Sequence, residues 1–334
     1  MDIFKGKSVL ITGGTGSFGQ KMIRQLLQDG GAQRVIVYSR DELKQFEMSH
    51  APGISGYHQM RYFIGDVRDR DRLEMGMRGI DIVVHAAALK QVPAAEYNPF
   101  EFVATNIIGA ENVVQSALRA GVKRVIALST DKAANPINLY GATKLASDKI
   151  FVAANNLTGD MGTRFSVVRY GNVVGSRGSV IPFFQKMIDE GADHLPITDE
   201  RMTRFWITLQ QGVDFVTDCL EKMHGGEIFV PKIPSMRIID LAHAMAPQLP
   251  LKVIGVRPGE KLHEIMITED DARNTAVVDN GYVIKPPISF WEGAKDTLSL
   301  GTPVAEGFVY SSNTNPDWAS KADLLAMIKE SSHD

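Results

Sequence analysis

The first half of the chain alternates short apolar runs with longer helical patterns, and no other feature limits its fold as strongly. The runs are rich in β-branched residues and lack polar alternation, which is typical of buried parallel strands. They are SVLIT (8–12), RVIVYS (34–39), RYFIGD (61–66), DIVVHAA (81–87), RVIALST (124–130) and RFSVVRYG (164–171), with helical patterns at 18–29, 100–120 and 139–155. This rhythm predicts an α/β, Rossmann-type doubly wound parallel sheet with helices on both faces.

A smaller C-terminal lobe is expected after about residue 175, where the rhythm becomes irregular and prolines recur. The helical pattern 209–223 and the apolar run 227–230 are regular again, so we expect them to return to the main sheet. The predicted division is therefore a main domain of residues 1–175 plus about 208–231, and a second lobe of about 176–207 and 232–334.

Composition excludes several classes of protein. The 334 residues are 44% hydrophobic and carry a net charge of −3, which gives no electrostatic reason to expect a nucleic-acid partner. The single cysteine, Cys219, forms no internal disulfide, and its apolar helical surroundings favour a buried structural thiol over a reactive one. The chain enters its first strand without a signal sequence, and no apolar run approaches the ~20 residues of a membrane span. We expect a soluble cytoplasmic protein without a membrane partner.

A glycine-rich turn, TGGTGSFG (12–19), follows the first expected strand and opens the first helix. Gly13 permits a tight turn, Gly16 lets the backbone approach a pyrophosphate, and Gly19 allows close packing of helix on sheet. The helix N-terminus then faces the phosphates. The turn predicts a dinucleotide site, with Thr15, Ser17 and Phe18 as its further members.

The end of the second strand, in YSRDELK, bears on the choice of dinucleotide. NAD sites usually place an acidic residue there to hold the ribose 2′-hydroxyl, whereas NADP sites supply arginine for the 2′-phosphate. Arg40 and Lys44 favour NADP, while Asp41 is also a good N-cap for the following helix. A solvated, charged helix start is the alternative interpretation. The expected cofactor contacts are Ser39, Arg40, Asp41, Glu42, Leu43 and Lys44.

Two further strand ends extend the expected cofactor site. Asp66 and Val67 follow the third strand, where the adenine edge is held. Ala86 and Lys90 follow the fourth strand, where cofactor and substrate meet at the carboxyl ends of the strands. Lys90 is either a contact to both ligands or a loop charge.

Tyr140 and Lys144 stand four residues apart on an expected helix and so share one face. An ordinary phenol has a pKa of about 10, too high for a base near neutrality. A neighbouring ammonium and a positively charged nicotinamide lower that pKa. With Thr130 at the preceding strand end, the pair predicts alcohol oxidation by the cofactor.

Taken together, these motifs resemble the extended short-chain dehydrogenase/reductase family over nearly the whole chain. Asp131 and Lys132 resemble the acid–base pair of its nucleotide-sugar 4,6-dehydratases. The resemblance implies that Tyr140 takes the C4 hydroxyl proton, Lys132 the C5 proton, and Asp131 protonates the departing C6 hydroxyl. These roles require that burial raise the pKa of Asp131, and that desolvation and nearby cations depress the pKa of Lys132. An ordinary ion pair is the alternative.

Lysine at position 132 resembles the inverting branch, which yields an L-sugar. Longer stretches such as HAAALKQVPAAEYNP and GVRPGEKLHE resemble members that act on UDP-N-acetylglucosamine at the start of pseudaminic acid synthesis for flagellin glycosylation. The resemblance also implies a homo-oligomer built from dimers, including hexamers, in which the 100–120 and 139–155 helices meet. An epimerase or reductase of the same fold, a retaining dehydratase and a non-catalytic NADP sensor are the alternatives.

The UDP-sugar site is expected along the segment that leaves the sixth strand. Asn172 suits a sugar or pyrophosphate oxygen, and Val173 is expected to pack near the nicotinamide. Arginines suit the pyrophosphate because their planar fork pairs two oxygens, although each also has a surface role as its alternative. Phe205 and Trp206 fit a core strand better than a uracil platform, and His194 and His263 show no metal spacing. The remaining expected substrate contacts are Arg177, Gly178, Ser179, Val180, Ile181, Arg204, Arg257, Pro258, Gly259 and Glu260; no metal site is expected.

Overall fold

The computed structural model describes residues 2–29, 31–176, 178–291 and 293–331. The main feature of the fold is a ten-stranded sheet with the strand order β16-β14-β15-β10-β6-β5-β4-β1-β2-β3. The first six strands pair in parallel, as the apolar runs predict. They are β1 (Ser8–Thr12), β2 (Arg34–Ser39), β3 (Met60–Ile64), β4 (Ile82–His85), β5 (Arg124–Thr130) and β6 (Arg164–Tyr170). The expected doubly wound sheet is confirmed.

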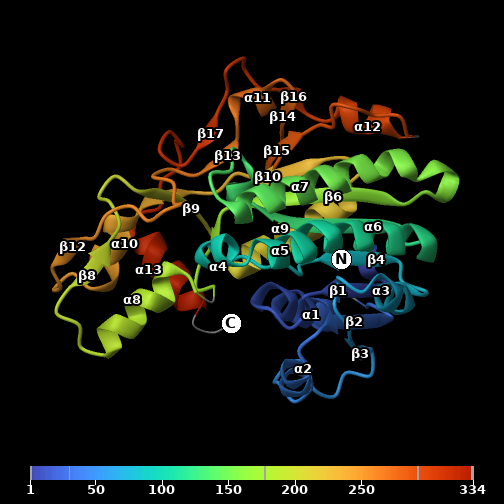
Figure 1. Ribbon diagram of the computed structural model, residues 1–334, viewed down its shortest axis with the longest axis horizontal. Coiled ribbons are helices and arrows are strands. Elements are labelled where there is room, and N and C mark those ends of the chain that lie inside the picture. The colour runs from blue at the N-terminus through green and yellow to red at the C-terminus, as the bar shows by residue number, and fades with distance from the viewer. Residues whose placement is uncertain (1, 30, 177, 292, 332–334) are drawn as a thin grey trace.

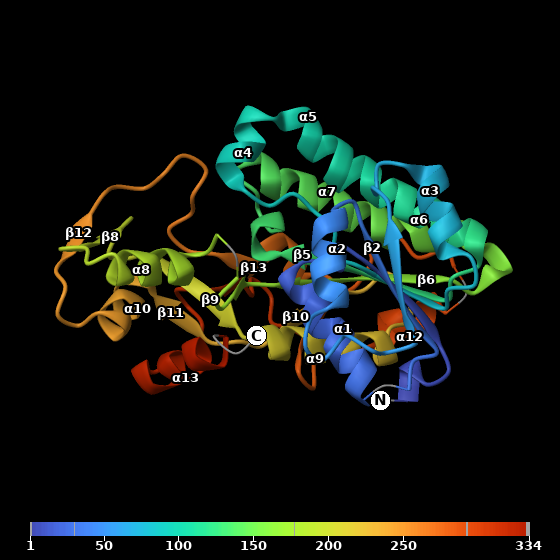
Figure 2. The same cartoon turned by 90° about the horizontal axis from the view of Figure 1, so that it is seen from below.

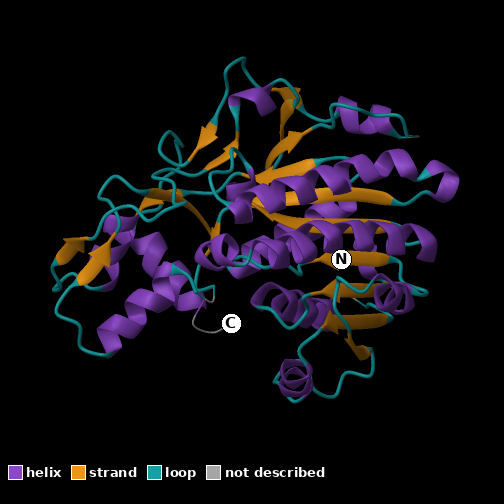
Figure 3. Ribbon diagram, viewed as in Figure 1, coloured by secondary structure: helices purple, strands orange, loops and turns teal. Residues whose placement is uncertain are grey.

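Helices cover both faces of this sheet (Figures 2 and 3). On one face α3, α6 and α7 lie side by side, and on the other α1 contacts α9. Short helices α4 and α5 continue the first layer towards the second lobe. The bounds are α1 (Ser17–Asp29), α2 (Glu42–Ser49), α3 (Arg70–Met77), α4 (Val92–Tyr97), α5 (Pro99–Phe102), α6 (Gly109–Ala120), α7 (Leu139–Ala154) and α9 (Leu209–Lys222).

The expected helix 100–120 is interrupted by a π-helical segment, Val103–Ile108. Wide turns of this kind are rare and often lie near functional sites. Here the segment turns the Asn106 side chain towards the loop after β4. Its amide oxygen accepts from the Leu89 N–H, its amide nitrogen donates to the Leu89 carbonyl, and both distances are 2.9 Å. The loop that carries Lys90 is thereby fixed against the helical layer.

After the first segment of the second lobe, the chain returns to the main sheet through α9 and β10, as expected. A capping box at Thr208 and Gln211 starts α9, and β10 (Ile228–Pro231) pairs in parallel with β6. Three antiparallel strands then extend the sheet beyond β10: β14 (Thr275–Val278), β15 (Gly281–Ile284) and β16 (Thr302–Pro303). Residues 275–303, assigned above to the second lobe, therefore add strands to the main sheet; the other domain boundaries stay predictions.

The second lobe lies at the left of Figure 1 and has its own apolar core, which includes Trp206, Phe184 and Leu241. The burial of Trp206 and Phe205 confirms that they are core residues. Its elements are β7 (Asn172–Val173), α8 (Val180–Asp189), β8 (Leu195–Ile197), β9 (Thr203–Ile207), β11 (Ser235–Arg237), α10 (Ile238–Met245), β12 (Leu251–Val253) and α13 (Lys321–Ser331). Between the lobes, β13 (Ile265–Ile267) pairs with β17 (Tyr310–Ser311), while α11 (Glu269–Ala272) and α12 (Ala294–Ser299) flank the added strands.

Two absences hold for the described ranges. None of their helices combines the length and apolar character needed to cross a bilayer. Nor do their His, Cys, Asp and Glu side chains gather into a group of three or more that suits a metal ion. Cys219 is buried, and burial raises the pKa of its thiol, consistent with a structural thiol.

Candidate active site

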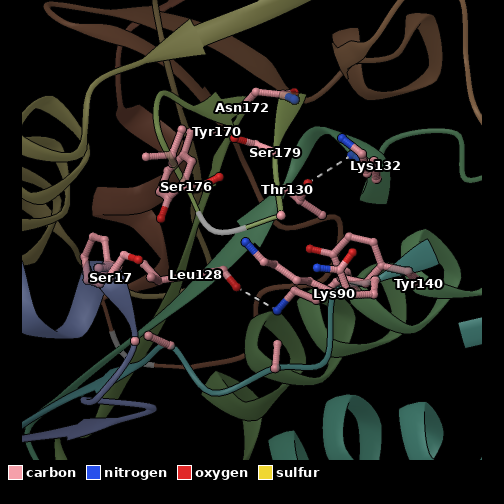
Figure 4. A pocket seen from close by; sticks show the side chains of 18 of the residues that line it. Ser17, Lys90, Leu128, Thr130, Lys132, Tyr140, Tyr170, Asn172, Ser176 and Ser179 are labelled. Carbon is pink, nitrogen blue, oxygen red and sulfur yellow. Dashed lines mark hydrogen bonds between the residues drawn. The ribbon is translucent and has the colours of Figure 1, made fainter. Parts of the chain in front are cut away.

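A cleft of about 570 Å³ opens where β1, β4, β5 and β6 end, beside the segment that leads into the second lobe (Figure 4). The carboxyl ends of parallel strands meet at one edge of the sheet, so the motifs that follow them converge there. The expected site residues that line the cleft are Gly13, Gly16, Ser17, Phe18, Gly19, Ala86, Lys90, Thr130, Lys132, Tyr140, Lys144, Asn172, Val173, Gly178, Ser179 and Glu260.

The glycine turn has the close packing that the sequence predicts. Gly13 has a φ of 65°, and a Cβ atom there would lie 2.8 Å from the Ala87 backbone nitrogen. A Cβ on Gly19 would lie 2.5 Å from the Cα of Gly14, so only glycine lets α1 start this close to β1. The turn therefore offers a cradle of bare backbone at a helix N-terminus, which fits the pyrophosphate of a dinucleotide.

Gly13→Ala is expected to destabilise the protein and empty the cofactor site, because the new Cβ meets the Ala87 backbone in addition to the strain of a positive φ. We expect a loss of about 1–3 kcal/mol in unfolding free energy. Thermal unfolding and the nucleotide content of the purified protein measure both effects.

Gly6→Ala is the matched control, since Gly6 has a φ of 69° and a Cβ there would meet no other part of the chain within 4 Å. It carries the same backbone strain without the collision. An equal loss in both variants would contradict the close-packing argument.

The strand ends next to β1 form the outer part of the expected cofactor site. Asp41 caps α2 by accepting from the Lys44 N–H at 3.0 Å, and its other oxygen pairs with the Lys44 ammonium at 2.6 Å. Its carboxylate is thus engaged within α2. The Arg40 side chain is 57% exposed and lies 3.8 Å from the Asp66 carboxylate. Ser39 shares a 3.0 Å hydrogen bond with Thr15, which ties this strand end to the glycine turn.

The remaining residues of the expected cofactor site that follow β2 and β3 lie at the surface or are packed against the sheet. Glu42 and Leu43 lie exposed on the first turn of α2. Asp66 accepts two hydrogen bonds from the Arg68 guanidinium, and Val67 is buried with its carbonyl bonded to Asn112. None of these side chains is among the described residues that line the cleft.

Tyr140 and Lys144 lie on α7, whose N-cap Asn138 accepts from the Gly141 N–H at 2.8 Å. Figure 4 shows Tyr140 beside Thr130 and Lys90 on one wall. Burial raises the pKa of Tyr140 to about 12, although the Lys132 ammonium and the Thr130 hydroxyl act to lower it. Burial also lowers the pKa of Lys144, whose ammonium donates to the Leu128 carbonyl at 2.7 Å. The phenol is therefore neutral until further positive charge arrives.

Asp131 and Lys132 form a 3₁₀ turn, Asp131–Ala133, directly after β5. Asp131 is fully buried, and its Oδ1 accepts from the Thr130 hydroxyl at 2.9 Å and from the Lys132 ammonium at 3.0 Å. Lys132 lines the cleft and keeps a quarter of its side chain exposed. Lys132 thus stands between the cleft and Asp131.

The electrostatics of this pair confirm one expectation and correct the other. Burial raises the pKa of Asp131, as predicted. Burial acts to lower the pKa of Lys132, but the carboxylates of Asp131 and Glu264 outweigh it and raise that pKa. The role of base required a depressed pKa, and the structure gives a raised one. Asp131 is the larger cause, and Glu264, 3.3 Å from the Lys132 ammonium, adds to it.

The expected substrate residues are only partly brought together. Asn172, Gly178, Ser179 and Glu260 line the cleft, together with Lys90. Val180 and Ile181 instead start α8, and Ile181 packs in the core of the second lobe. Arg177 lies outside the described residues.

The two remaining arginines differ in environment. Arg204 is 5% exposed, and its guanidinium donates to the carbonyls of Thr203 and Leu262. It lies behind the cleft wall. Arg257 and Pro258 are exposed on a loop, and Gly259 follows them with its carbonyl bonded to Asn138 at 2.8 Å.

Several cleft residues were missed by sequence reasoning. Gln91, Ser176 and Tyr170 line the cleft, each within a few residues of a predicted position. Position relative to a strand end is the signal that finds them. Glu264, which is not among the described residues that line the cleft, ends the quoted stretch GVRPGEKLHE, but no signal in the sequence places it beside Lys132. His263 and His194 bond to Thr203 and Asp193, which fits structural roles.

Comparison with known proteins decides the family. The chain is 59% identical to the UDP-N-acetylglucosamine 4,6-dehydratase (inverting) of Campylobacter jejuni over 98% of both chains. The chain belongs to this dehydratase family. The polysaccharide biosynthesis protein family also matches residues 9–286. These matches confirm the resemblance that the motifs indicated.

More distant relatives of the dehydratase family share its fold. Pen from Bacillus thuringiensis superposes with a TM-score of 0.88 at 36% identity over 98% of both chains. DesIV of Streptomyces venezuelae, a dTDP-glucose 4,6-dehydratase, superposes with a TM-score of 0.69 at 24% identity, covering 87% of this chain and 95% of that one. A UDP-glucose 4-epimerase of Rickettsia bellii is 41% identical over 84% of both chains. Proteins named as dehydratases and as epimerases are thus both similar to this chain, so the fold alone does not decide the reaction.

Proposed function

We propose that the protein converts UDP-N-acetylglucosamine to UDP-2-acetamido-2,6-dideoxy-β-L-arabino-hex-4-ulose and water. The observation that carries this proposal is the Asp131–Lys132 pair, which stands in the same cleft as Tyr140 and Lys144. Oxidation or epimerisation at C4 needs only the tyrosine and lysine. Elimination of water across C5 and C6 needs a further base and acid, and the 59% identity to inverting dehydratases agrees with that need.

The cofactor is NADP, held tightly and reused in every turnover. The bare backbone of the glycine turn fits its pyrophosphate, and Arg40, whose side chain is 57% exposed, fits a 2′-phosphate. Asp41 is engaged as cap and ion-pair partner within α2, which removes the acidic group that NAD sites use. When bound, the oxidised nicotinamide supplies a positive charge near Tyr140, accepts the hydride from C4 and returns it to C6.

Tyr140 takes the proton of the C4 hydroxyl as C4 becomes a ketone. The Lys132 ammonium and the Thr130 hydroxyl favour the phenolate, and the buried Lys144 supplies a further positive charge one helical turn away. The ketone then acidifies the C5 proton, which makes elimination accessible to an amine base.

Lys132 is the member of the acid–base pair that reaches the sugar. One proton passed from its Nζ to Oδ1 of Asp131, along the 3.0 Å hydrogen bond, produces a neutral amine and a neutral carboxyl at once. The Lys132 amine takes the C5 proton. The proton on Asp131 is relayed past Lys132 to the C6 hydroxyl, which then leaves as water. The C4 hydride enters C6, C5 takes a proton from water on the opposite face, and Tyr140 returns its proton to water, so the net change is loss of one water.

The same family likeness supports the place of the reaction in the cell. We infer that it is the first step of pseudaminic acid synthesis for flagellin glycosylation in the cytoplasm. We also infer a homo-oligomer of dimers, extending to a hexamer, in which α6 and α7 meet their counterparts.

Arg40→Ala tests the choice of dinucleotide. Loss of the guanidinium is expected to weaken NADP binding by about tenfold or more, because a charge-assisted bond to phosphate contributes about 1.5–3 kcal/mol. NAD binding is expected to change little. Titration of the emptied protein with each dinucleotide measures both constants, and Arg119→Ala, an exposed arginine paired with Glu74, is the control. Equal weakening of NAD and NADP would contradict a 2′-phosphate contact.

Proton NMR of the protein with UDP-N-acetylglucosamine in deuterated buffer, without added NADPH, tests the reaction. The expected product shows a C6 methyl signal, deuterium at C5 and couplings of the arabino configuration. A methyl signal with unchanged C5 configuration would indicate a retaining dehydratase. A C4 epimer without a methyl signal would indicate that the protein is an epimerase.

A further inference from the structure

Glu264 is a buried carboxyl group that the mechanism above does not use. It directly precedes β13, which packs against the 3₁₀ turn of Asp131 and Lys132, and only 2% of its surface is exposed. Ser312 fixes its backbone: the Ser312 hydroxyl accepts from the Glu264 N–H at 2.9 Å, and the Ser312 N–H donates to the Glu264 carbonyl at 2.8 Å. The carboxyl group is thus held beside the acid–base pair by the antiparallel pair of strands β13 and β17.

Three cations from different elements face this carboxyl group. Its Oε1 lies 3.3 Å from the Lys132 ammonium and 3.7 Å from Nε of Arg204 on β9, and Lys261 adds a third positive charge. The other oxygen, Oε2, is buried and finds no hydrogen-bond partner among the described residues. A carboxylate this deeply buried is costly unless cations offset its desolvation, so its position beside Lys132 calls for an explanation.

Lys132 therefore lies between two buried carboxyl groups, Asp131 at 3.0 Å and Glu264 at 3.3 Å. We propose that Glu264 is a positioning residue for the dehydration: its carboxylate orients the Lys132 ammonium at the cleft wall and determines the pH range in which the Lys132–Asp131 pair works. The inference rests on the proposed function, because it assigns a role within the elimination step.

The charges around Lys132, Asp131 and Glu264 support these different roles. Burial acts to raise the pKa of Glu264, but Lys132, Arg204 and Lys261 outweigh it and lower that pKa. Glu264 therefore stays ionised. Burial raises the pKa of Asp131, and the negative charge of Glu264 adds to the effect while Lys132 opposes it. Of the two carboxyl groups, Asp131 is therefore the one that can accept the Lys132 proton and pass it on.

The remaining charged neighbours do not replace Glu264. Arg204 is also 3.7 Å from Glu260, so its guanidinium is shared between two carboxylates. Lys261 donates to the Ala134 carbonyl at 2.7 Å, which directs its ammonium to the backbone. Tyr140 is neutral in the free protein. Glu264 is thus the negative charge that acts on both members of the pair.

The test is the pH dependence of kcat in Glu264→Gln, followed by NMR detection of the C6 methyl product. Loss of the negative charge weakens proton binding by both Lys132 and Asp131, so their pKa values fall together. The acidic and the alkaline limbs of the profile are therefore both expected to shift to lower pH, by about one to three units. A merely structural role would lower kcat at every pH without moving the limbs.

Two further variants keep the test decisive. Glu264→Asp retains the charge but withdraws it by one methylene, so a smaller shift in the same direction is expected. Tyr310→Phe removes a buried hydroxyl from β17, the strand that pairs with β13, without changing charge, and is expected to lower thermal stability while leaving the profile in place. If Glu264→Gln does not fold, the shift in Glu264→Asp decides the question.

The results separate this inference from the proposed function. An unshifted profile in the glutamine variant, or in the aspartate variant where that one decides, overturns the role of Glu264. An equal shift in Tyr310→Phe also overturns it, because the loss of an uncharged group near β13 would then suffice. Absence of the methyl product from the unaltered protein overturns the proposed function instead.

Discussion

Tyr140→Phe is expected to lower kcat by about 10²–10⁴-fold, the usual contribution of a positioned acid–base group. The phenol oxygen is the only atom removed, and it is the group that receives the C4 hydroxyl proton. Without it the C4 ketone does not form, so no later step proceeds. Cofactor content and UDP-N-acetylglucosamine binding are expected to stay within a few-fold, because the shape of the cleft is unchanged. Product NMR and calorimetric titration make the two measurements.

Tyr310→Phe is the matched control. Tyr310 is also a buried phenol, and its hydroxyl bonds to the Ile233 backbone, remote from the cleft. Its loss is expected to cost about 1 kcal/mol of stability without affecting turnover. Retention of turnover in Tyr140→Phe would show that another group takes the C4 proton. An equal loss in both variants would point to general damage from a missing buried hydroxyl.

Much of the fold follows from local patterns, because parallel strands buried on both faces leave a strong signal. The apolar runs mark the bounds of β1 to β6 closely at each end. The glycine turn was equally predictable from the sequence, since Gly13 and Gly19 lie where a Cβ atom would collide with the backbone. The three antiparallel strands that extend the sheet were not recognised, because short strands in an irregular part of the chain lack such a pattern.

The candidate site was predictable where its residues follow strand ends and unpredictable where long-range packing decides. Thr130, Lys132 and Tyr140 could be placed together because β5 and α7 lie close in the chain. Glu264 could not, because it lies far along the chain from Lys132 and only the packing of β13 against the 3₁₀ turn joins them. Glu264 adds to the effect of the adjacent Asp131, and together the two carboxylates raise the Lys132 pKa against the effect of burial. A prediction of the Lys132 pKa from sequence alone therefore lacks one of the two charges that determine its direction.

Lys132→Met is expected to separate oxidation from elimination. Methionine keeps most of the length and apolar bulk of the side chain but cannot take the C5 proton. Turnover to the methyl product is expected to fall by about 10²–10⁴-fold. Oxidation at C4 needs Tyr140 and is expected to continue at a lower rate, since the Lys132 charge assists the phenolate. Reduced nicotinamide is therefore expected to accumulate on the protein after substrate is added, visible by its absorbance, with no deuterium at C5.

Lys261→Met distinguishes a base from a general source of positive charge. Lys261 belongs to the same cluster of charges, but its ammonium bonds to the Ala134 carbonyl and it is not among the residues that line the cleft. Its replacement removes one positive charge near Glu264 without removing the group that faces the sugar. Less than about a tenfold loss is expected, with no accumulation of reduced nicotinamide. If the two variants behaved alike, the charge of the cluster, and not the Lys132 amine, would drive the elimination.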